Sequence, residues 1–190
     1  LKRARAALES NDNQNLKYAA LELRIAMESL TYDRAKAYKD EFPPDEYEIW
    51  QPRKVMAVLL EIDATADKDS TLSYGIEETP GQPPSQMTMI GTETVLNMET
   101  LRRHYDALGS FLHVATLKQT KSGKGHDHGK LRMRCTEIAG YLDKVLSSPV
   151  HNVTLGNFAT IDCAECGKPI RKRIPATAET VEAVVPRDVV

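Results

Sequence analysis

The longest regular pattern of hydrophobic residues runs through residues 14–41. Apolar side chains recur there at steps of three and four residues, which places them on one face of an α-helix. Polar residues at 11–13 can cap such a helix, and Pro43 and Pro44 are expected to end it. The spacing therefore predicts one long amphipathic helix. Its apolar stripe consists of Leu16, Ala19, Ala20, Leu23, Ala26, Met27 and Leu30.

Shorter stretches with the same periodicity predict further helices. These cover residues 2–10, 52–62, 97–113 and 131–146. Pro52 suits the first turn of its helix, because a helix needs no hydrogen bond from the N–H there. Asn97 is placed to cap the helix that follows it. The helical segments together predict a bundle.

Alternation of polar and apolar residues replaces the helical period in other parts of the chain. The predicted strands cover residues 71–78, 86–95, 153–161, 169–174 and 180–185. The first two flank a proline-rich loop and predict a β-hairpin between helices. The expected fold is therefore mainly α. Residues 1–148 form a helical bundle with a hairpin insert at about 71–95, and residues 149–190 form a small C-terminal β appendage.

Composition limits the classes to which the chain can belong. It has 190 residues, 41% of them hydrophobic, which suffices for a core. No stretch reaches the roughly 18 apolar residues that a membrane span needs, and no signal peptide is evident. We therefore expect a cytoplasmic protein with no membrane association and with reduced cysteines. Acidic residues outnumber basic ones in residues 1–95, and the reverse holds in 96–190, where any polyanion contact is expected.

The most specific chemical pattern is the pair Cys163 and Cys166, followed by Gly167. Two thiolates at this spacing can bind one metal ion from a tight turn, and glycine permits that turn. With a predicted strand on each side, residues 158–174 resemble the knuckle of the zinc-ribbon family. The resemblance implies that these cysteines hold zinc as a cofactor. A metal-free turn with two free thiols and a redox-active pair are the alternatives.

Structural zinc has four ligands, and this chain contains no second CxxC. A second pair is expected beyond Val190, in a longer native protein. The other sources of ligands are His126 and His128, or the CxxC of a second subunit. Cys135 lies on the apolar stripe of a predicted helix and is expected to be an inert core residue.

Residues 20–30 and 101–113 resemble the HEPN-like helical modules of bacterial conflict and defence proteins. In those families an early helix with Arg and Glu, here Arg24 and Glu28, packs on a late helix that ends near a His, here His113. HEPN ribonucleases typically place an Arg four to six residues before a His, and this sequence lacks that spacing. The resemblance therefore implies a non-catalytic version in a bacterial defence or toxin–antitoxin setting.

The alternative function is a HEPN-like ribonuclease or toxin that uses Arg102 and Arg103 with His104 and His113. An arginine would stabilise charge on the scissile phosphate, and a histidine would transfer a proton. The simpler interpretation places His113 at a helix C-terminus, bonded to the backbone. It also places His104 on the surface, beside the two arginines.

Basic residues form two runs in the second half of the chain, one over residues 118–134 and one after the CxxC. The second run contains Lys168, Arg171, Lys172 and Arg173. Such residues on a strand can contact phosphates without base selectivity, or simply protect a solvated edge strand from further pairing. We expect a non-catalytic interaction module. Its bundle associates with a protein partner or a second copy, and its tail contacts a partner or nucleic acid.

Overall fold

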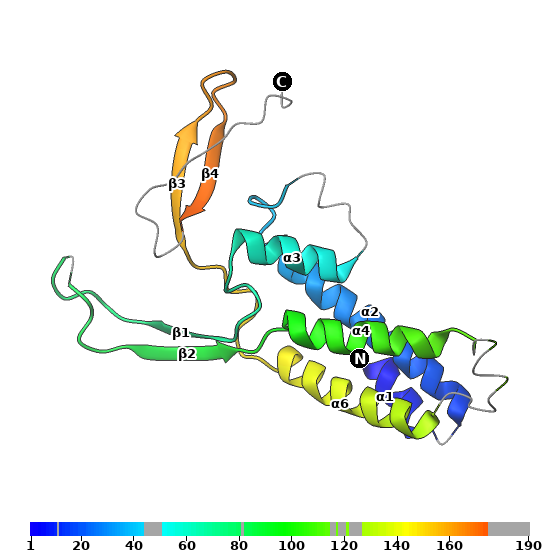
Figure 1. Cartoon of the computed structure of the whole chain (residues 1–190). Helices are drawn as coiled ribbons and strands as arrows, with labels where there is room; N and C mark the ends of the chain where they lie inside the picture. The colour runs from blue at the N-terminus through cyan, green and yellow to red at the C-terminus, as the bar shows by residue number, and fades with distance from the viewer. Residues whose placement is uncertain are drawn as a thin grey trace.

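The computed structural model describes residues 1–10, 12–43, 51–80, 82–114, 117, 121 and 127–174 (Figure 1). The helices are α1 (Lys2–Glu9), α2 (Asn13–Ala37), α3 (Pro52–Ile62), α4 (Met98–Leu112) and α6 (His128–Leu146). The strands are β1 (Ser70–Tyr74), β2 (Thr88–Glu93), β3 (Asn157–Asp162) and β4 (Pro169–Ile174). The predicted mainly α class is confirmed. The strand predicted over residues 180–185 lies outside the described residues.

The helices pack around α2, which contacts α1, α3, α4 and α6. Most of the predicted stripe of α2 is completely buried, and Leu101 of α4 and Ile138 of α6 belong to the same core. Each buried aliphatic side chain of this size contributes about 1.5–3 kcal/mol relative to an exposed one. The stripes recognised in the sequence therefore hold the bundle together.

Capping side chains start α2, α4 and α6. Asp12 and Asn97 each accept a backbone N–H from the first turn of the following helix, as the sequence indicates. Helix α6 begins at His128, earlier than predicted, because Asp127 Oδ1 accepts the N–H of Lys130 at 3.0 Å. A cap in a polar segment thus extends the helix beyond its apolar stripe.

Helix α2 ends at Ala37, earlier than predicted, so Pro43 and Pro44 do not end it. The chain turns at Tyr38, whose carbonyl oxygen accepts the N–H of Phe42 at 3.0 Å. Both aromatic side chains are buried. The helix stops because this turn returns the second aromatic residue to the core.

Strands β1 and β2 form an antiparallel hairpin, the β1–β2 arm, which projects from one end of the bundle (Figure 1). Ser70 pairs with Glu93, and a β-bulge lies further along the ladder. The arm packs on the rest of the chain at its base. A Cβ at Gly91 would lie 2.5 Å from Cγ of Pro149, so the close approach there requires glycine.

Strands β3 and β4 form a second antiparallel hairpin, the tail hairpin, which also projects from the bundle (Figure 1). Strand β4 has the predicted bounds, but β3 begins at Asn157, later than predicted, because Val153 donates its N–H to a side chain of the arm. This hairpin is consistent with a zinc-ribbon appendage, which itself stays a prediction. Among the described residues, no helix combines the length and apolar composition that a membrane span requires.

Candidate functional site

The predicted zinc knuckle forms the turn at the tip of the tail hairpin. The N–H of Cys163 donates to the carbonyl oxygen of Lys168 at 2.9 Å, and the N–H of Gly167 donates to the carbonyl oxygen of Cys163 at 2.8 Å. Gly167 has a φ of 67°, in the left-handed region that glycine tolerates best. These contacts close a tight turn that contains Cys163 and Cys166, with two residues between them.

The backbone of this turn surrounds the sulfur of Cys163 with donors. Hydrogen bonds from the backbone of Cys166 and of Glu165, and from the Cys166 side chain, hold the pKa of Cys163 below its ordinary value. Zinc binds the thiolate form of cysteine. Both cysteines are free of disulfide bonds. The turn therefore fits a pair of zinc ligands.

Cys163 and Cys166 provide two of the four ligands that structural zinc needs. The described part of the chain contains no group of three or more Cys, His, Asp or Glu side chains that could hold a metal ion. His128 starts α6, and His126 lies outside the described residues. Cys135 is completely buried, and burial raises its pKa to about 11, which confirms the predicted core role. The source of the remaining ligands stays a prediction.

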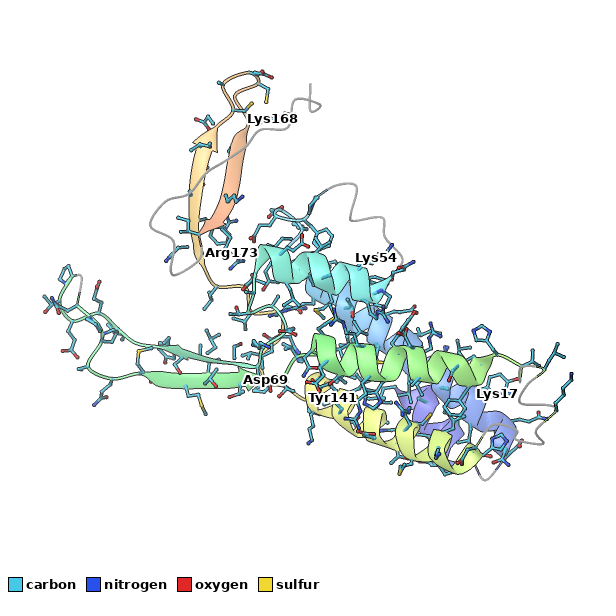
Figure 2. All side chains as sticks on the ribbon, viewed as in Figure 1. Lys17, Lys54, Asp69, Tyr141, Lys168 and Arg173 are labelled. Atoms are coloured by element: carbon cyan, nitrogen blue, oxygen red, sulfur yellow. The ribbon has the colours of Figure 1, made fainter. Side chains whose placement is uncertain are left out.

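Lys168, Arg171 and Lys172 are exposed on the tail hairpin, and Figure 2 labels Lys168 near the tip. Arg171 stacks on Phe158, with its guanidinium carbon 3.6 Å from the ring centroid. Across the described ranges, none of these three cations has an ion-pair partner. They outnumber the exposed acidic residues of the same hairpin, Asp162 and Glu165.

Arg173 was predicted to act with these cations, but it lies at the base of the tail hairpin, against the bundle (Figure 2). Its Nε and Nη2 donate to the two carboxylate oxygens of Glu41 at 2.9 and 3.0 Å. Its Nη1 lies 3.5 Å from Oδ2 of Asp63 and donates to the carbonyl oxygen of Leu155 at 3.0 Å. The side chain is 9% exposed. Arg173 therefore docks the hairpin onto the bundle.

The carboxylate of Asp63 is fixed by several donors. The hydroxyl of Tyr38 donates to Oδ2 at 2.9 Å, and Thr65 donates to Oδ1. Burial by itself would raise the pKa of Asp63, but these hydrogen bonds and the charge of Arg173 outweigh burial and hold the pKa below its ordinary value. Burial also raises the pKa of Tyr38 to about 12. We call Arg173, Glu41, Asp63 and Tyr38 the tail socket.

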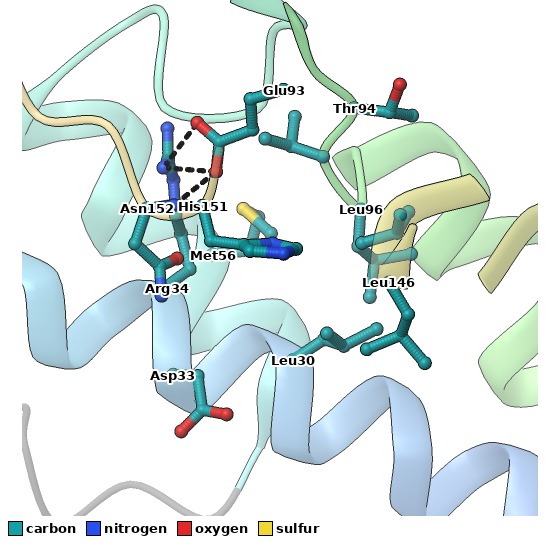
Figure 3. Close-up of a pocket in the computed structure, with 12 residues that line it drawn as sticks. Leu30, Asp33, Arg34, Met56, Glu93, Thr94, Leu96, Leu146, His151 and Asn152 are labelled. Carbon is teal, nitrogen blue, oxygen red and sulfur yellow. Dashed lines mark hydrogen bonds and ion pairs between the residues drawn. The ribbon is translucent and has the colours of Figure 1, made fainter. Parts of the chain in front are cut away.

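A second buried ion pair lies at the base of the β1–β2 arm (Figure 3). Arg34 Nη1 lies 3.2 and 3.3 Å from the two oxygens of Glu93, and Arg34 Nε donates to the carbonyl oxygen of Ala66 at 3.1 Å. Glu93 also accepts the backbone N–H groups of Asn152 and Val153. This carboxylate thus joins α2, the end of β2 and the segment that leads to β3. We call Arg34 and Glu93 the arm socket.

Neither socket is predicted from the sequence, although the sequence contains signals for the arm socket. Arg34 continues the buried face of α2 that includes Thr31. Glu93 alternates with Gly91 on the side of β2 that faces the bundle. A charged residue at a core position of each element indicates a buried pair, but it does not identify the partner.

His104 on α4 is 3% exposed, so the predicted surface position is wrong. It lies three residues after Leu101 and four before Leu108, both of which are buried. The helical period therefore places the imidazole on the core face of α4, next to residues of α6.

The residues of the ribonuclease alternative do not form one cluster in the described structure. Arg102 is exposed, and Arg103 donates to Oε1 of Glu137 at 2.8 Å. His113 is the C-cap residue of α4, as the simpler interpretation predicts. It lies nine residues after His104, which is about 13 Å of helix rise.

Replacing His104 with leucine is expected to raise the free energy of unfolding by about 1 kcal/mol, because Nδ1 is buried with no hydrogen-bond partner among the described residues. Burial lowers the pKa of His104; the charge of Glu137 raises it, and those of Arg103 and Arg134 lower it. The folded state therefore binds the proton less readily than the unfolded state. Stability of the wild type should fall as the pH drops below about 6.5.

Urea unfolding on either side of that pH measures both effects. His104→Leu is expected to reduce the pH dependence of the free energy of unfolding. His113→Leu, which replaces the exposed C-cap histidine of the same helix, should leave that pH dependence unchanged. A His104→Leu variant with an unchanged pH dependence would show that another group causes it.

The structure defines a mainly α protein with two projecting β-hairpins, one of which ends in a two-cysteine turn. Comparison of the chain with protein-family models, with curated proteins and with solved structures gave no match. The HEPN-like and zinc-ribbon-like resemblances therefore stay predictions from the sequence.

Proposed function

We propose that the chain is a non-catalytic interaction module whose tail hairpin contacts the phosphate backbone of a nucleic acid. The supporting observation is that Lys168, Arg171 and Lys172 are exposed on this hairpin while Arg173 anchors it. Lysine and arginine at phosphates supply affinity that does not depend on sequence. Phe158 is covered by Arg171, which favours backbone contact over base stacking.

Zinc has a structural role in this proposal. Cys163 and Cys166 supply two ligands, and the other two come from outside the described residues or from a second subunit. The N–H of Cys163 is bonded to the carbonyl oxygen of Lys168, so a metal that fixes the cysteines also fixes the backbone of this lysine. Zinc would thus make the hairpin tip rigid.

The bundle supports the hairpins in this proposal. Its association with a protein partner or second copy, and a setting in bacterial defence, stay predictions from the sequence. The non-catalytic role is favoured because Arg103 is paired with Glu137 and His104 is buried. A ribonuclease that used these residues would need them to rearrange.

Fluorescence anisotropy of the full chain with labelled single-stranded RNA and duplex DNA tests the nucleic-acid contact. We expect binding that weakens steeply with salt, because it depends on phosphate contacts. Lys168→Glu combined with Lys172→Glu should weaken affinity at least about tenfold. Lys17→Glu combined with Lys54→Glu is the matched control, because it makes the same change of charge on the bundle.

Absence of binding to both probes, or equal weakening by the control, would contradict the nucleic-acid contact. Zinc content of the same preparations should fall in Cys163→Ser. Cleavage of the RNA that is lost in Arg103→Ala with His113→Ala would instead favour the ribonuclease alternative.

A further inference from the structure

A cleft lies between the C-terminal end of α3 and the base of the tail hairpin, where Figure 2 labels Arg173. Its volume is about 720 Å³. Small-molecule sites in proteins typically have volumes of about 300–1,000 Å³ and apolar walls with a few polar groups. The apolar residues that line this cleft come from both elements and from the segment before β3. They are Leu60, Ile62, Ala64, Leu155 and Ile174. The cleft therefore has the size and the walls of a site for a small organic molecule.

The buried charges beside this cleft are bound to one another. Arg173 pairs with both Glu41 and Asp63. Tyr38 and Thr65 donate further hydrogen bonds to Asp63. Two carboxylates thus share one guanidinium, and the tail socket carries one more negative than positive charge. No donor of the socket is left over for an anion.

Glu61 adds a carboxylate that the described protein does not neutralise. It lines the cleft at an exposed position, and no cation of the described ranges forms an ion pair with it. The residues three and four positions away on either side carry no positive charge. Arg171 and Lys172 line a smaller neighbouring cleft that Glu61 also borders, but neither is paired with it. Glu61 is therefore available to a cationic group of a ligand.

The C-terminal end of α3 makes the same cleft more negative. The carbonyl oxygens of residues 60–62 accept no hydrogen bond from the described backbone, as is usual in the last turn of a helix. The helix dipole places partial negative charge at this end and favours a cation there. The last turn of α3 contains no basic residue, so the helix itself does not supply that cation.

We propose that this cleft binds a small organic cation, a primary ammonium group on an apolar chain. The ammonium group pairs with Glu61 at the end of α3, and the chain lies along Leu155 and Ile174. The walls belong to the bundle and to the tail hairpin, so the bound cation holds the hairpin against the bundle. This inference does not rest on the proposed nucleic-acid function, because it uses neither the cysteines nor the exposed cations of β4.

Titration of the full chain with n-hexylammonium, followed by NMR of the backbone amides, tests the site. We expect saturable shifts at residues 60–65 and 155–157. Uncharged n-hexanol should bind about three- to fivefold more weakly, the range of an ion pair at a partly exposed site. Anionic n-hexanoate should not bind. Ethylammonium should bind more weakly than n-hexylammonium, because its shorter chain buries less apolar surface. Saturation with n-hexylammonium should also slow hydrogen exchange in β3 and β4.

Three variants separate the predicted site from other modes of binding. Glu61→Gln removes the free carboxylate, so it should weaken n-hexylammonium about three- to fivefold and leave n-hexanol unchanged. Asn157→Asp adds a carboxylate at an exposed residue that lines the cleft from the hairpin, and should strengthen n-hexylammonium by a similar factor. Glu99→Gln is the matched control, because it removes the same charge from an exposed glutamate of α4 and should leave both affinities unchanged. Circular dichroism of all three should match the wild type, since the replaced side chains are exposed.

Three results would overturn the proposal. The first is that n-hexylammonium causes no saturable shifts, or causes them only at residues outside the cleft. The second is that n-hexanol binds as tightly as n-hexylammonium, which would show that the negative charge of the cleft selects nothing. The third is that Glu61→Gln and Glu99→Gln have the same effect on affinity.

Discussion

Replacing Glu93 with alanine is expected to lower the free energy of unfolding by about 3–5 kcal/mol. The substitution leaves Arg34, whose side chain is 8% exposed, without its carboxylate. It also removes the acceptor of the backbone N–H groups of Asn152 and Val153. A buried charge without its counter-ion is far less favourable than the intact pair, because the bond from Arg34 Nε to the carbonyl oxygen of Ala66 is then its one remaining hydrogen bond among the described residues and does not neutralise the charge. Urea unfolding followed by circular dichroism measures the loss.

Glu78→Ala is the matched control for this prediction. Glu78 is an exposed glutamate of the same arm, so its loss should change stability by less than about 0.5 kcal/mol. Replacing both Arg34 and Glu93 with methionine removes the two charges together and should recover most of the loss. A Glu93→Ala variant as stable as the wild type would show that the arm socket does not stabilise the fold.

The helices could be predicted because each one follows a local rule. Helix α3 begins at Pro52, as predicted, since proline fits the first turn. Helix α4 begins after Asn97, whose side chain caps it. Apolar residues at helical spacing then determine which face of each helix is buried. These rules need no knowledge of distant segments, and so the mainly α class followed from the sequence.

Contacts between distant segments could not be predicted in this way. Arg34 and Glu93 are 59 residues apart, and charged residues are ordinarily expected on the surface. His104 is predicted on the surface beside Arg102 and Arg103, although its spacing from Leu101 and Leu108 places it on the core face. In each case the burial of a polar residue depends on what packs against it.

The same distinction, between contacts of neighbouring residues and contacts of distant segments, applies to the candidate site. The turn at Cys163 and Gly167 depends on residues next to one another, and the structure contains it. Arg171 and Arg173 belong to one basic run, and the pattern gives them the same expected role. Their roles differ because Arg173 donates hydrogen bonds to Glu41, 132 residues earlier in the chain, whereas Arg171 stacks on Phe158 and stays exposed.

Arg173→Ala is therefore expected to undock the tail hairpin and leave the bundle folded. The variant loses two hydrogen bonds to Glu41, and bonds to a charged group are worth about 1.5–3 kcal/mol each. It also leaves two carboxylates, Glu41 and Asp63, without their shared cation. Hydrogen exchange at the amides of β3 and β4 should accelerate at least about tenfold. Arg171→Ala, two residues away on the same strand, is the matched control and should change exchange little.

The titration of Asp63 provides a second readout of docking. Its pKa is held below the ordinary value of about 3.9, so its contribution to stability is complete above that value and is lost as the pH falls through the lowered pKa. Arg173→Ala removes one of the groups that lower this pKa, so the pKa of Asp63 measured by NMR should rise. If Asp63 titrates as in the wild type and the hairpin amides keep their protection, packing around Phe158, and not the tail socket, holds the hairpin in place.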